Sequence, residues 1–359
     1  MIHWIDDNNA TIDDTRFVFA ADPPDWFAPA RAAAGTEHIF VFKTKAMLTP
    51  YLELFELFPH ANVVELGIFG GGSVAFNALV GKPNKLVAID IIDGPVEALT
   101  NVIEKHDLHA VVSPHYGVDQ ADRDAVEATV SSQFGDAPLD LVLDDASHLY
   151  GPTLASFEVL FPRLRPGGRY VIEDWASEHY DANLMFSAVV GAHDGLAEKL
   201  AEKVAAALTS DDPVTRQKVK DLWSMAMARP GSQMHAAMWR WFETVTVDPA
   251  FGVAPVLIAQ LLPLRDEAIR HAPSSSLTDA QPPMMRLAIE LVLATTWGPG
   301  VVADVTFNDQ WIHVTRGPAE LAPDEFRLDG MYTDYFGVVG DWPREPARRD
   351  PTLRPPVGR

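Results

Sequence analysis

The chain has 359 residues, with 50 Asp and Glu against 28 Lys and Arg, which gives a formal net charge of −22. Such a charge repels a phosphate backbone and argues against general binding of DNA or RNA. The absence of cysteine excludes disulfides, zinc ribbons, iron–sulfur clusters and thiol nucleophiles, so any metal must be held by oxygen or imidazole. With 47% apolar residues the chain can bury a full core, and its length fits about two domains or one elaborated domain.

We identify neither a membrane-spanning segment nor an export signal in the sequence. No stretch approaches the roughly 18–20 uncharged apolar residues of a membrane-spanning helix. The first residues, MIHWIDDNNATIDD, are acidic and lack the basic and apolar regions of a signal peptide. We therefore expect a soluble, cytoplasmic protein that binds neither membranes nor nucleic acid.

The first 180 residues change from an unpatterned segment to a regular alternation. Residues 1–35 are expected to be irregular, and residues 45–58 carry apolar residues at helical spacing. Five short apolar runs then alternate with helical patterns at about 73–80, 95–107, 122–133 and 152–164, which predicts a parallel sheet covered by helices on both faces. The runs are Val63–Leu66, Lys85–Ile91, Val111–His115, Asp140–Leu143 and Arg169–Ile172.

After residue 180 the alternation stops. Residues 183–298 have helical patterns only, and two strand-like runs, VVADVTF and WIHVTRG, then flank Asn308-Asp309-Gln310 and predict a hairpin. The Pro- and Arg-rich end has no periodicity. We therefore predict a segment 1–60 that packs on the core, an α/β domain made of 61–180 and 300–320, a helical insert at 181–299 and a C-terminal extension at 321–359.

The first motif is VVELGIFGGGS at residues 63–73, where a strand runs into a glycine-rich turn that opens a helix near Ser73. Glycines allow a ligand to approach the backbone, and a helix N-terminus offers free N–H groups. Gly70, Gly72 and Ala75 also satisfy the dinucleotide fingerprint, and Asp90 follows at about the distance expected for a ribose contact. NAD and S-adenosylmethionine are therefore competing ligands.

The second and third motifs are acidic and follow two consecutive strands. LDLVLDDASH ends at His148, and PGGRYVIEDW contains Glu173 and Asp174. A right-handed crossover places the carboxyl ends of consecutive parallel strands side by side, so Asp145, Glu173 and Asp174 should converge with His148 nearby. Clustered carboxylates repel one another unless a cation lies among them, and oxygen ligands without sulfur favour Mg²⁺, Ca²⁺ or Mn²⁺.

The order of these motifs resembles that of the metal-dependent sugar O-methyltransferases of macrolide biosynthesis. The matching elements are E-x-G-x-x-x-G-G-[SA], an acidic end of the second strand, D-D-x-S-H, and P-G-G-x-Y-V-I-E-D. The resemblance covers roughly residues 60–178, and the hairpin at 301–316 resembles the last two strands of that fold. It implies a doubly wound, Rossmann-like methyltransferase sheet, mostly parallel with an antiparallel final hairpin, and a helical insertion between strands five and six. The size of the insert and the first 60 residues depart from the family.

The resemblance implies a cofactor, a metal and a base. The cofactor would be S-adenosylmethionine, and Mg²⁺ or another oxygen-preferring divalent cation would be held by Asp145, Glu173 and Asp174. His148 would be the general base, with Asp145 beside it as the second catalytic residue. Residues that follow the acidic motifs directly are predicted to contact the acceptor, and these are Tyr150, Trp175 and His179.

The same resemblance assigns cofactor contacts along the first four strands. Residues of the glycine-rich turn would line the methionine moiety, Asp90 would accept hydrogen bonds from the ribose hydroxyls, and Asp119 would lie near the adenine. Phe69 stands where the family has its second motif glycine. The cofactor set comprises Glu65, Gly67, Phe69, Gly71, Ser73, Asp90, Asp119, Gln120 and Asp144.

Together these features predict an O-methyltransferase that acts on a hydroxyl of a sugar or glycosylated natural product. The acceptor would offer adjacent hydroxyls to the metal, and the helical insert would act as a lid and acceptor wall. A homo-oligomer is compatible with this interpretation. Three alternatives stay open: a phenolic or catechol O-methyltransferase with the same metal geometry, an NAD-dependent oxidoreductase, and a non-catalytic protein that binds S-adenosylmethionine.

Overall fold

The structure is a computed structural model that describes residues 2–20, 38–176, 284–297, 300–308, 310–334, 337 and 339. The chain divides into two compact units, Met1–Asp174 with Ala288–Phe336, and Trp175–Leu287 with Gly337–Arg359. The sheets and nearly all the described residues belong to the first unit. The predicted helical insert and the predicted acceptor residue His179 lie outside the described residues, apart from the segment that forms helix α12 (Met284–Trp297).

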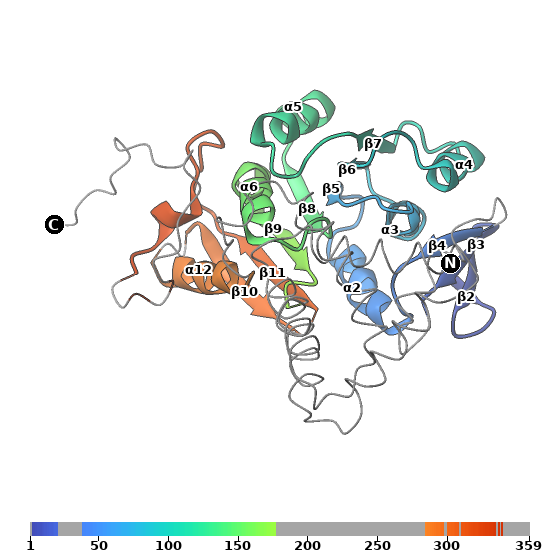
Figure 1. Cartoon of the computed structure of the whole chain (residues 1–359), viewed down its shortest axis with the longest axis horizontal. Coiled ribbons are helices and arrows are strands. Elements are labelled where there is room, and N and C mark those ends of the chain that lie inside the picture. Colours follow the sequence, from blue (N-terminus) through green and yellow to red (C-terminus); the bar gives the residue numbers. More distant parts are fainter. Residues whose placement is uncertain are drawn as a thin grey trace, which may run out of the picture. The chain divides into compact units, whose positions relative to one another are not determined.

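A seven-stranded sheet is the centre of the first unit (Figure 1). The strands lie in the order β10-β11-β9-β8-β5-β6-β7, and the five strands β5 to β9 are parallel. β11 pairs antiparallel with both β9 and β10, which confirms the predicted final hairpin. The bounds are β5 (Asn62–Leu66), β6 (Lys85–Asp90), β7 (Val112–Tyr116), β8 (Leu139–Asp144), β9 (Leu164–Glu173), β10 (Val302–Phe307) and β11 (Trp311–Arg316).

Helices connect the parallel strands as the alternation predicts. α4 shows why: its Leu99, Val102 and Ile103 are buried at the i, i+3, i+4 spacing of an amphipathic helix. At α5, the Asp122 side chain accepts a hydrogen bond from the Ala125 N–H and so caps the helix. The connecting helices are α3 (Gly72–Phe76, continued by a π-helical turn at Asn77–Gly81), α4 (Glu97–Lys105), α5 (Arg123–Phe134) and α6 (Tyr150–Leu160).

The expectation that residues 1–35 are irregular is wrong for their described part. A separate four-stranded sheet has the order β1-β2-β3-β4, with β1 (Ile2–Trp4), β2 (Asn9–Ile12), β3 (Thr15–Phe19) and β4 (His38–Val41). The strands are short, and the acidic turns between them hide an alternation that buries Ala10, Ile12, Phe17 and Phe19. The predicted helix at 45–58 is present as a 3₁₀ turn at Ala46–Leu48 followed by α2 (Thr49–Leu57).

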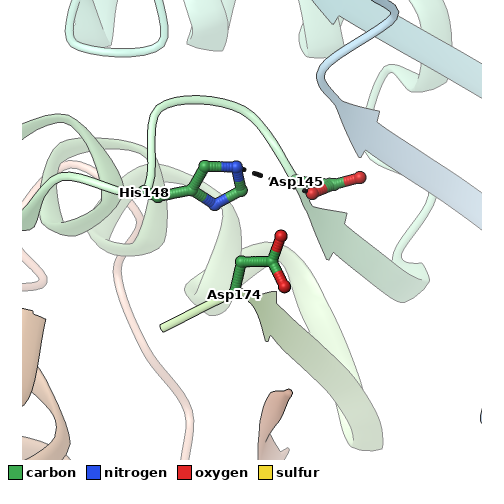
Figure 2. Close-up of side chains that lie close together, drawn as sticks. All are labelled: Asp145, His148 and Asp174. Atoms are coloured by element: carbon green, nitrogen blue, oxygen red, sulfur yellow. Dashed lines mark ion pairs between the residues drawn. The ribbon is translucent and has the colours of Figure 1, made fainter. Parts of the chain in front are cut away.

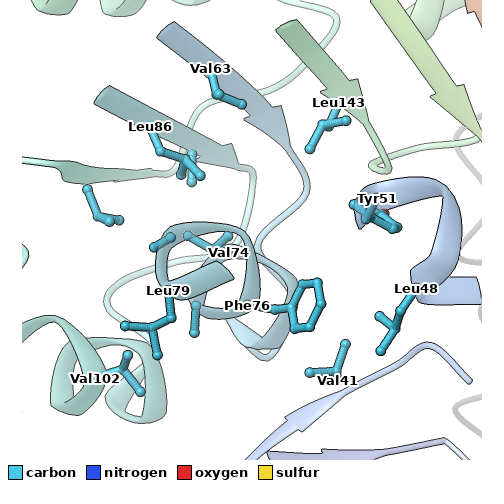
Figure 3. Close-up of a cluster of buried hydrophobic side chains, with 14 of the residues drawn as sticks. Val41, Leu48, Tyr51, Val63, Val74, Phe76, Leu79, Leu86, Val102 and Leu143 are labelled. Atoms are coloured by element: carbon cyan, nitrogen blue, oxygen red, sulfur yellow. The ribbon is translucent and has the colours of Figure 1, made fainter. Parts of the chain in front are cut away.

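The core joins the small sheet to the large one (Figure 3). Phe76 of α3 contacts the ring of Phe17 edge-on at 6.4 Å, while Val63, Leu86 and Leu143 cover the α3 side of the large sheet. The opposite side is covered separately, since Phe157 of α6 packs against Tyr170 of β9. Helices on both faces confirm the doubly wound arrangement. Within the described residues, no helix combines the length and the apolar character needed to cross a bilayer.

Candidate functional site

The carboxyl ends of β8 and β9 bring the acidic motifs together. The two strands pair in parallel, with Asp144 opposite Ile172, so the residues that follow each strand share one edge of the sheet. Asp145 follows β8, Glu173 ends β9 and Asp174 follows it. The N–H of Asp145 also donates to the carbonyl of Leu66 at the end of β5, which places the acidic edge beside the glycine-rich turn.

Asp145, Asp174 and the nearby His148 form a group that could hold a cation. Asp145, His148 and Asp174 each offer one ligand atom, and these atoms lie within 4.8 Å of one another on half-buried side chains (Figure 2). The pKa of Asp174 is raised because burial penalises its charge and Asp145 repels it, against the attraction of His148. The two carboxylates are donors for an oxygen-preferring divalent ion, and the imidazole lies within reach of a group bound beside them.

The backbone of β9 orients the His148 ring. Its Nδ1 lies 3.3 Å from the carbonyl oxygen of Glu173, and its Nε2 lies 3.8 Å from Oδ1 of Asp145. His148 has a φ of 52° and Asp174 a φ of 49°, a left-handed conformation that non-glycine residues rarely adopt. Strained backbone of this kind is concentrated at functional sites. Two members of the three-residue group have this conformation, as do six other non-glycine residues in the described part of the chain.

The structure adds two residues to the site that sequence reasoning missed. The ammonium of Lys43 lies 2.7 Å from Oδ2 of Asp145 and 2.8 Å from Oε2 of Glu173, and the hydroxyl of Tyr51 donates to Oε1 of Glu173. Burial alone would lower the pKa of Lys43, but the two carboxylates outweigh it and raise that pKa. Lys43 follows the apolar run of β4 and is itself buried, which is rare for an unpaired lysine. In the sequence, the available signal was a lysine placed directly after the apolar residues 39–42.

The glycine-rich turn is required by the packing of the protein itself. Gly67 has a φ of 98°, and a Cβ there would lie 2.2 Å from the carbonyl oxygen of Asp145. A Cβ on Gly72 would lie 1.9 Å from the carbonyl oxygen of Phe40 in the small sheet. Asp90 closes the turn, since its carboxylate accepts hydrogen bonds from the N–H groups of Ile68, Phe69 and Ile92. The turn is therefore held rigidly between β8, β4 and β6.

Further residues of the predicted cofactor set lie at this turn. Glu65 is buried and accepts a hydrogen bond of 2.8 Å from Asn77. Burial raises the pKa of Glu65 to about 7, while hydrogen bonds from Ser73 and Asn77 lower it. Phe69 is 67% exposed with a φ of 47°, and Gly71 is the N-cap residue of α3.

The remaining predicted cofactor residues separate into a buried pair and an exposed one. Gln120 donates hydrogen bonds to Asp144 and Ser156, and Tyr170 donates to Asp144 at 2.7 Å. Burial raises the pKa of Asp144 to about 6, which these hydrogen bonds partly oppose. Asp119 is exposed, and its carboxylate accepts from the N–H of Ala121. Asp144 and Gln120 thus form an internal network, and only Asp119 faces solvent.

Of the predicted acceptor residues, Tyr150 has hydrogen bonds that the structure describes. The hydroxyl of Tyr150 donates to both carboxylate oxygens of Glu290 on α12, at 3.1 and 2.9 Å, and Tyr332 donates to the same carboxylate. Trp175 belongs to the second unit, and His179 is not described. The hydrogen bonds of Tyr150 therefore link α6 to α12.

Comparison with known proteins identifies the central segment. Residues 64–175 match the family model of a methyltransferase domain. The 8-demethyl-8-alpha-L-rhamnosyl tetracenomycin-C 2'-O-methyltransferase of Streptomyces olivaceus is 29% identical over 168 residues, 44% of this chain and 36% of that protein. The mycinamicin VI 2''-O-methyltransferase of Micromonospora griseorubida is 31% identical over 119 residues, 31% of this chain and 26% of that protein. The predicted family resemblance is confirmed over this stretch, which spans about a third of these relatives or less.

Matches to solved structures have lower sequence identity. The MycE methyltransferase from the mycinamycin biosynthetic pathway, solved in complex with Mg, SAH and mycinamycin VI, is 17% identical with a TM-score of 0.35. The alignment covers 79% of this chain and 50% of that one.

Proposed function

We propose, from the methyltransferase domain that residues 64–175 form, that this chain is an S-adenosylmethionine-dependent O-methyltransferase that requires a divalent cation. The observation that carries the proposal is the convergence of Asp145, His148 and Asp174 within 4.8 Å beside the glycine-rich turn. The acceptor would be a hydroxyl of a sugar or glycosylated natural product. This choice is supported by the named activities of the two curated relatives, which are 2'-O- and 2''-O-methyltransferases.

The cation would be held at the outer edge of the acidic cluster. Asp145 and Asp174 offer carboxylate oxygens there, and Glu173 is paired with Lys43. A bound Mg²⁺ would lower the pKa of an acceptor hydroxyl that it binds, from the value of about 15–16 that is near that of water. The chain itself supplies the position of the hydroxyl and the group that accepts its proton.

His148 would accept that proton at Nε2. Because the carbonyl of Glu173 can only accept a hydrogen bond, Nδ1 carries the proton in the resting ring and Nε2 has the lone pair. Asp145 would stabilise the imidazolium that forms, since its Oδ1 lies 3.8 Å from Nε2. The acceptor oxygen would then be placed to attack the methyl carbon of the donor in line, with S-adenosylhomocysteine as the leaving group. In-line placement of two bound substrates contributes several kcal/mol to lowering the barrier.

The methyl donor would lie along the carboxyl ends of β5, β6 and the segment after β7. We assign Glu65, Gly67 and Gly71 to the methionine moiety, Asp90 to the ribose and Asp119 to the adenine. The rigid turn between β8, β4 and β6 supports this placement, because a preorganised backbone costs little further ordering on binding. Asp144 and Gln120 would act through the buried network that supports the loop carrying Ser147.

The test is methyl transfer from isotopically labelled S-adenosylmethionine, in the presence of Mg²⁺, to a panel of rhamnosides, other deoxysugar glycosides and catechols. Transfer to a glycoside hydroxyl supports the proposal, whereas transfer to catechols alone identifies a phenolic enzyme. Calorimetric titration with S-adenosylhomocysteine and with NAD separates the remaining alternatives. Binding of NAD without S-adenosylhomocysteine would contradict the proposal, and tight S-adenosylhomocysteine binding without transfer to any acceptor would favour a non-catalytic protein.

A further inference from the structure

One charged residue of the site is not used by the proposed reaction. Lys43 lies just after β4 of the small sheet and is 6% exposed, yet its ammonium contacts the carboxylates at the ends of two strands of the large sheet. Its two distances, 2.7 Å to Asp145 and 2.8 Å to Glu173, are nearly equal. The ammonium thus occupies the point at which a metal ion would lie if these two carboxylates held it together.

Both carboxylate oxygens of Glu173 accept a hydrogen bond from the protein. Its Oε2 accepts from Lys43, its Oε1 accepts from Tyr51, and the residue is 2% exposed. The ammonium of Lys43 also lies 5.3 Å from the centre of the Tyr51 ring, within the range of a cation–π contact. A buried ammonium with two carboxylates and an aromatic ring around it is costly to expel, because its charge would lose every partner at once.

Asp145 is shared between two halves of the site. Its Oδ2 faces Lys43, whereas its Oδ1 faces His148. The inner half, made of Lys43, Tyr51 and Glu173, is buried and already carries a cation. The outer half, made of Asp145, His148 and Asp174, is half-exposed and is the group whose ligand atoms lie within 4.8 Å of one another.

We propose that Lys43 is a positioning residue that serves as the resident cation of the inner half, holding Glu173 out of the divalent ion's shell and leaving Asp145 and Asp174 as the carboxylates that bind it. This inference rests on the proposed function, since it concerns the same metal site. It has two consequences. Lys43 lowers the affinity for a divalent ion by charge repulsion, and it makes the small N-terminal sheet part of the metal centre.

The experiment measures Mn²⁺ binding by calorimetry and electron paramagnetic resonance in the full chain. Lys43→Met keeps the side-chain length and removes the charge, so Mn²⁺ should bind at least about tenfold more tightly. Lys43→Met combined with Glu173→Gln keeps the net charge and should bind within about threefold of the wild type. Asp174→Asn should weaken binding at least about tenfold. Lys45→Met is the matched control, because Lys45 is half-exposed and pairs with Asp7, and it should leave binding unchanged.

The double variant decides between the two arrangements. If Glu173 is a ligand and Lys43 leaves when the ion arrives, the double variant will lose affinity as Asp174→Asn does, and the inference is overturned. Equal Mn²⁺ affinity in the wild type and Lys43→Met overturns it as well, as does the absence of Mn²⁺ binding in both. Thermal melting of each variant shows that it is folded, and the charge-balanced double variant covers the case in which Lys43→Met is too unstable.

Failure of the proposed function gives a different result. If no acceptor is methylated but the four variants follow the expected order of Mn²⁺ affinities, the role of Lys43 holds and the reaction assignment is wrong.

Discussion

The Nδ1 atom of His148 lies 3.3 Å from the backbone carbonyl oxygen of Glu173, at the end of β9. The strand that supplies one carboxylate of the site therefore also determines the tautomer of the imidazole. A backbone carbonyl can only accept a hydrogen bond, so it favours the tautomer that carries the proton on Nδ1 and leaves Nε2 as the acceptor. The geometry suits a general base whose orientation does not depend on another ionisable side chain.

The role of His148 can be tested without disturbing its backbone. Asn tolerates the left-handed conformation that this position requires, so His148→Asn removes the base and preserves the φ of 52°. Methyl transfer should fall at least about 100-fold at neutral pH, the usual contribution of general-base catalysis. Mn²⁺ affinity should stay within a few-fold. Activity within a few-fold of the wild type would show that His148 is not the base, and lost Mn²⁺ binding would show that it is a ligand.

Metal removal should abolish the reaction. After EDTA treatment and buffer exchange, the rate should fall to the background and return when Mg²⁺ or Mn²⁺ is added. Asp174→Asn keeps a residue type that accepts the φ of 49° and should raise the Mg²⁺ concentration needed for half-maximal rate at least about tenfold. Full activity after complete chelation would eliminate the metal from the mechanism.

Gly67 should be intolerant of any side chain for reasons of packing. A Cβ there lies 2.2 Å from the carbonyl oxygen of Asp145, whereas a Cβ on Gly70 meets nothing within 4 Å. Gly67→Ala should therefore lower the free energy of unfolding by more than about 2 kcal/mol, while Gly70→Ala should change it by less than about 0.5 kcal/mol. Urea unfolding compares the two variants. Equal losses would contradict the close approach between β5 and β8.

Glu65 should make stability depend on pH. Its pKa is raised from 4.5 to about 7 in the folded chain, so the folded state binds a proton that the unfolded state releases. The contribution of Glu65 to stability is therefore fully present below pH 4.5 and is lost as pH rises from 4.5 to about 7, by about 3 kcal/mol in total. Glu65→Gln should lack this loss. The difference in unfolding free energy between the two chains, measured by urea at pH 5 and pH 8, isolates Glu65. A constant difference would show that its carboxyl group titrates normally.

Tyr150 should stabilise the fold through its hydrogen bonds to Glu290. Tyr150 and Tyr332 are both buried and both donate to Glu290, so Tyr332→Phe is a matched control for Tyr150→Phe. Each variant should lose about 1–2 kcal/mol of stability, because a buried carboxylate loses one of its donors. The KM for the acceptor should stay within about twofold in both. A raised KM in Tyr150→Phe alone would instead support the acceptor contact that the sequence predicts.

Local patterns were enough to predict the arrangement that creates the site. The apolar runs at 85–91 and 140–143 match β6 and β8 closely, because a strand buried on both faces needs an unbroken apolar run. The handedness of the crossover then predicted that Asp145 and Asp174 share an edge of the sheet. Their proximity follows from the order of elements alone, without any knowledge of side-chain packing.

Long-range contacts were beyond the reach of those patterns. Lys43 and Glu173 are 130 positions apart, and Tyr51 and Glu173 are 122 apart. Nothing near Lys43 in the sequence indicates which strand its ammonium meets. The small sheet was missed for a related reason, because strands of three to five residues between acidic turns carry too few apolar positions to show their alternation.

The sequence by itself determined the order of strands and helices, the glycine-rich turn and the convergence of acidic motifs, since each depends on local periodicity or on a general rule of chain crossover. Only the tertiary structure decided how the three carboxylates and the imidazole of the site divide into two groups. Glu173 is satisfied by Lys43 and Tyr51, whereas Asp145, His148 and Asp174 remain grouped. That division depends on where β4 and α2 pack against the sheet, and packing is a property of the whole fold.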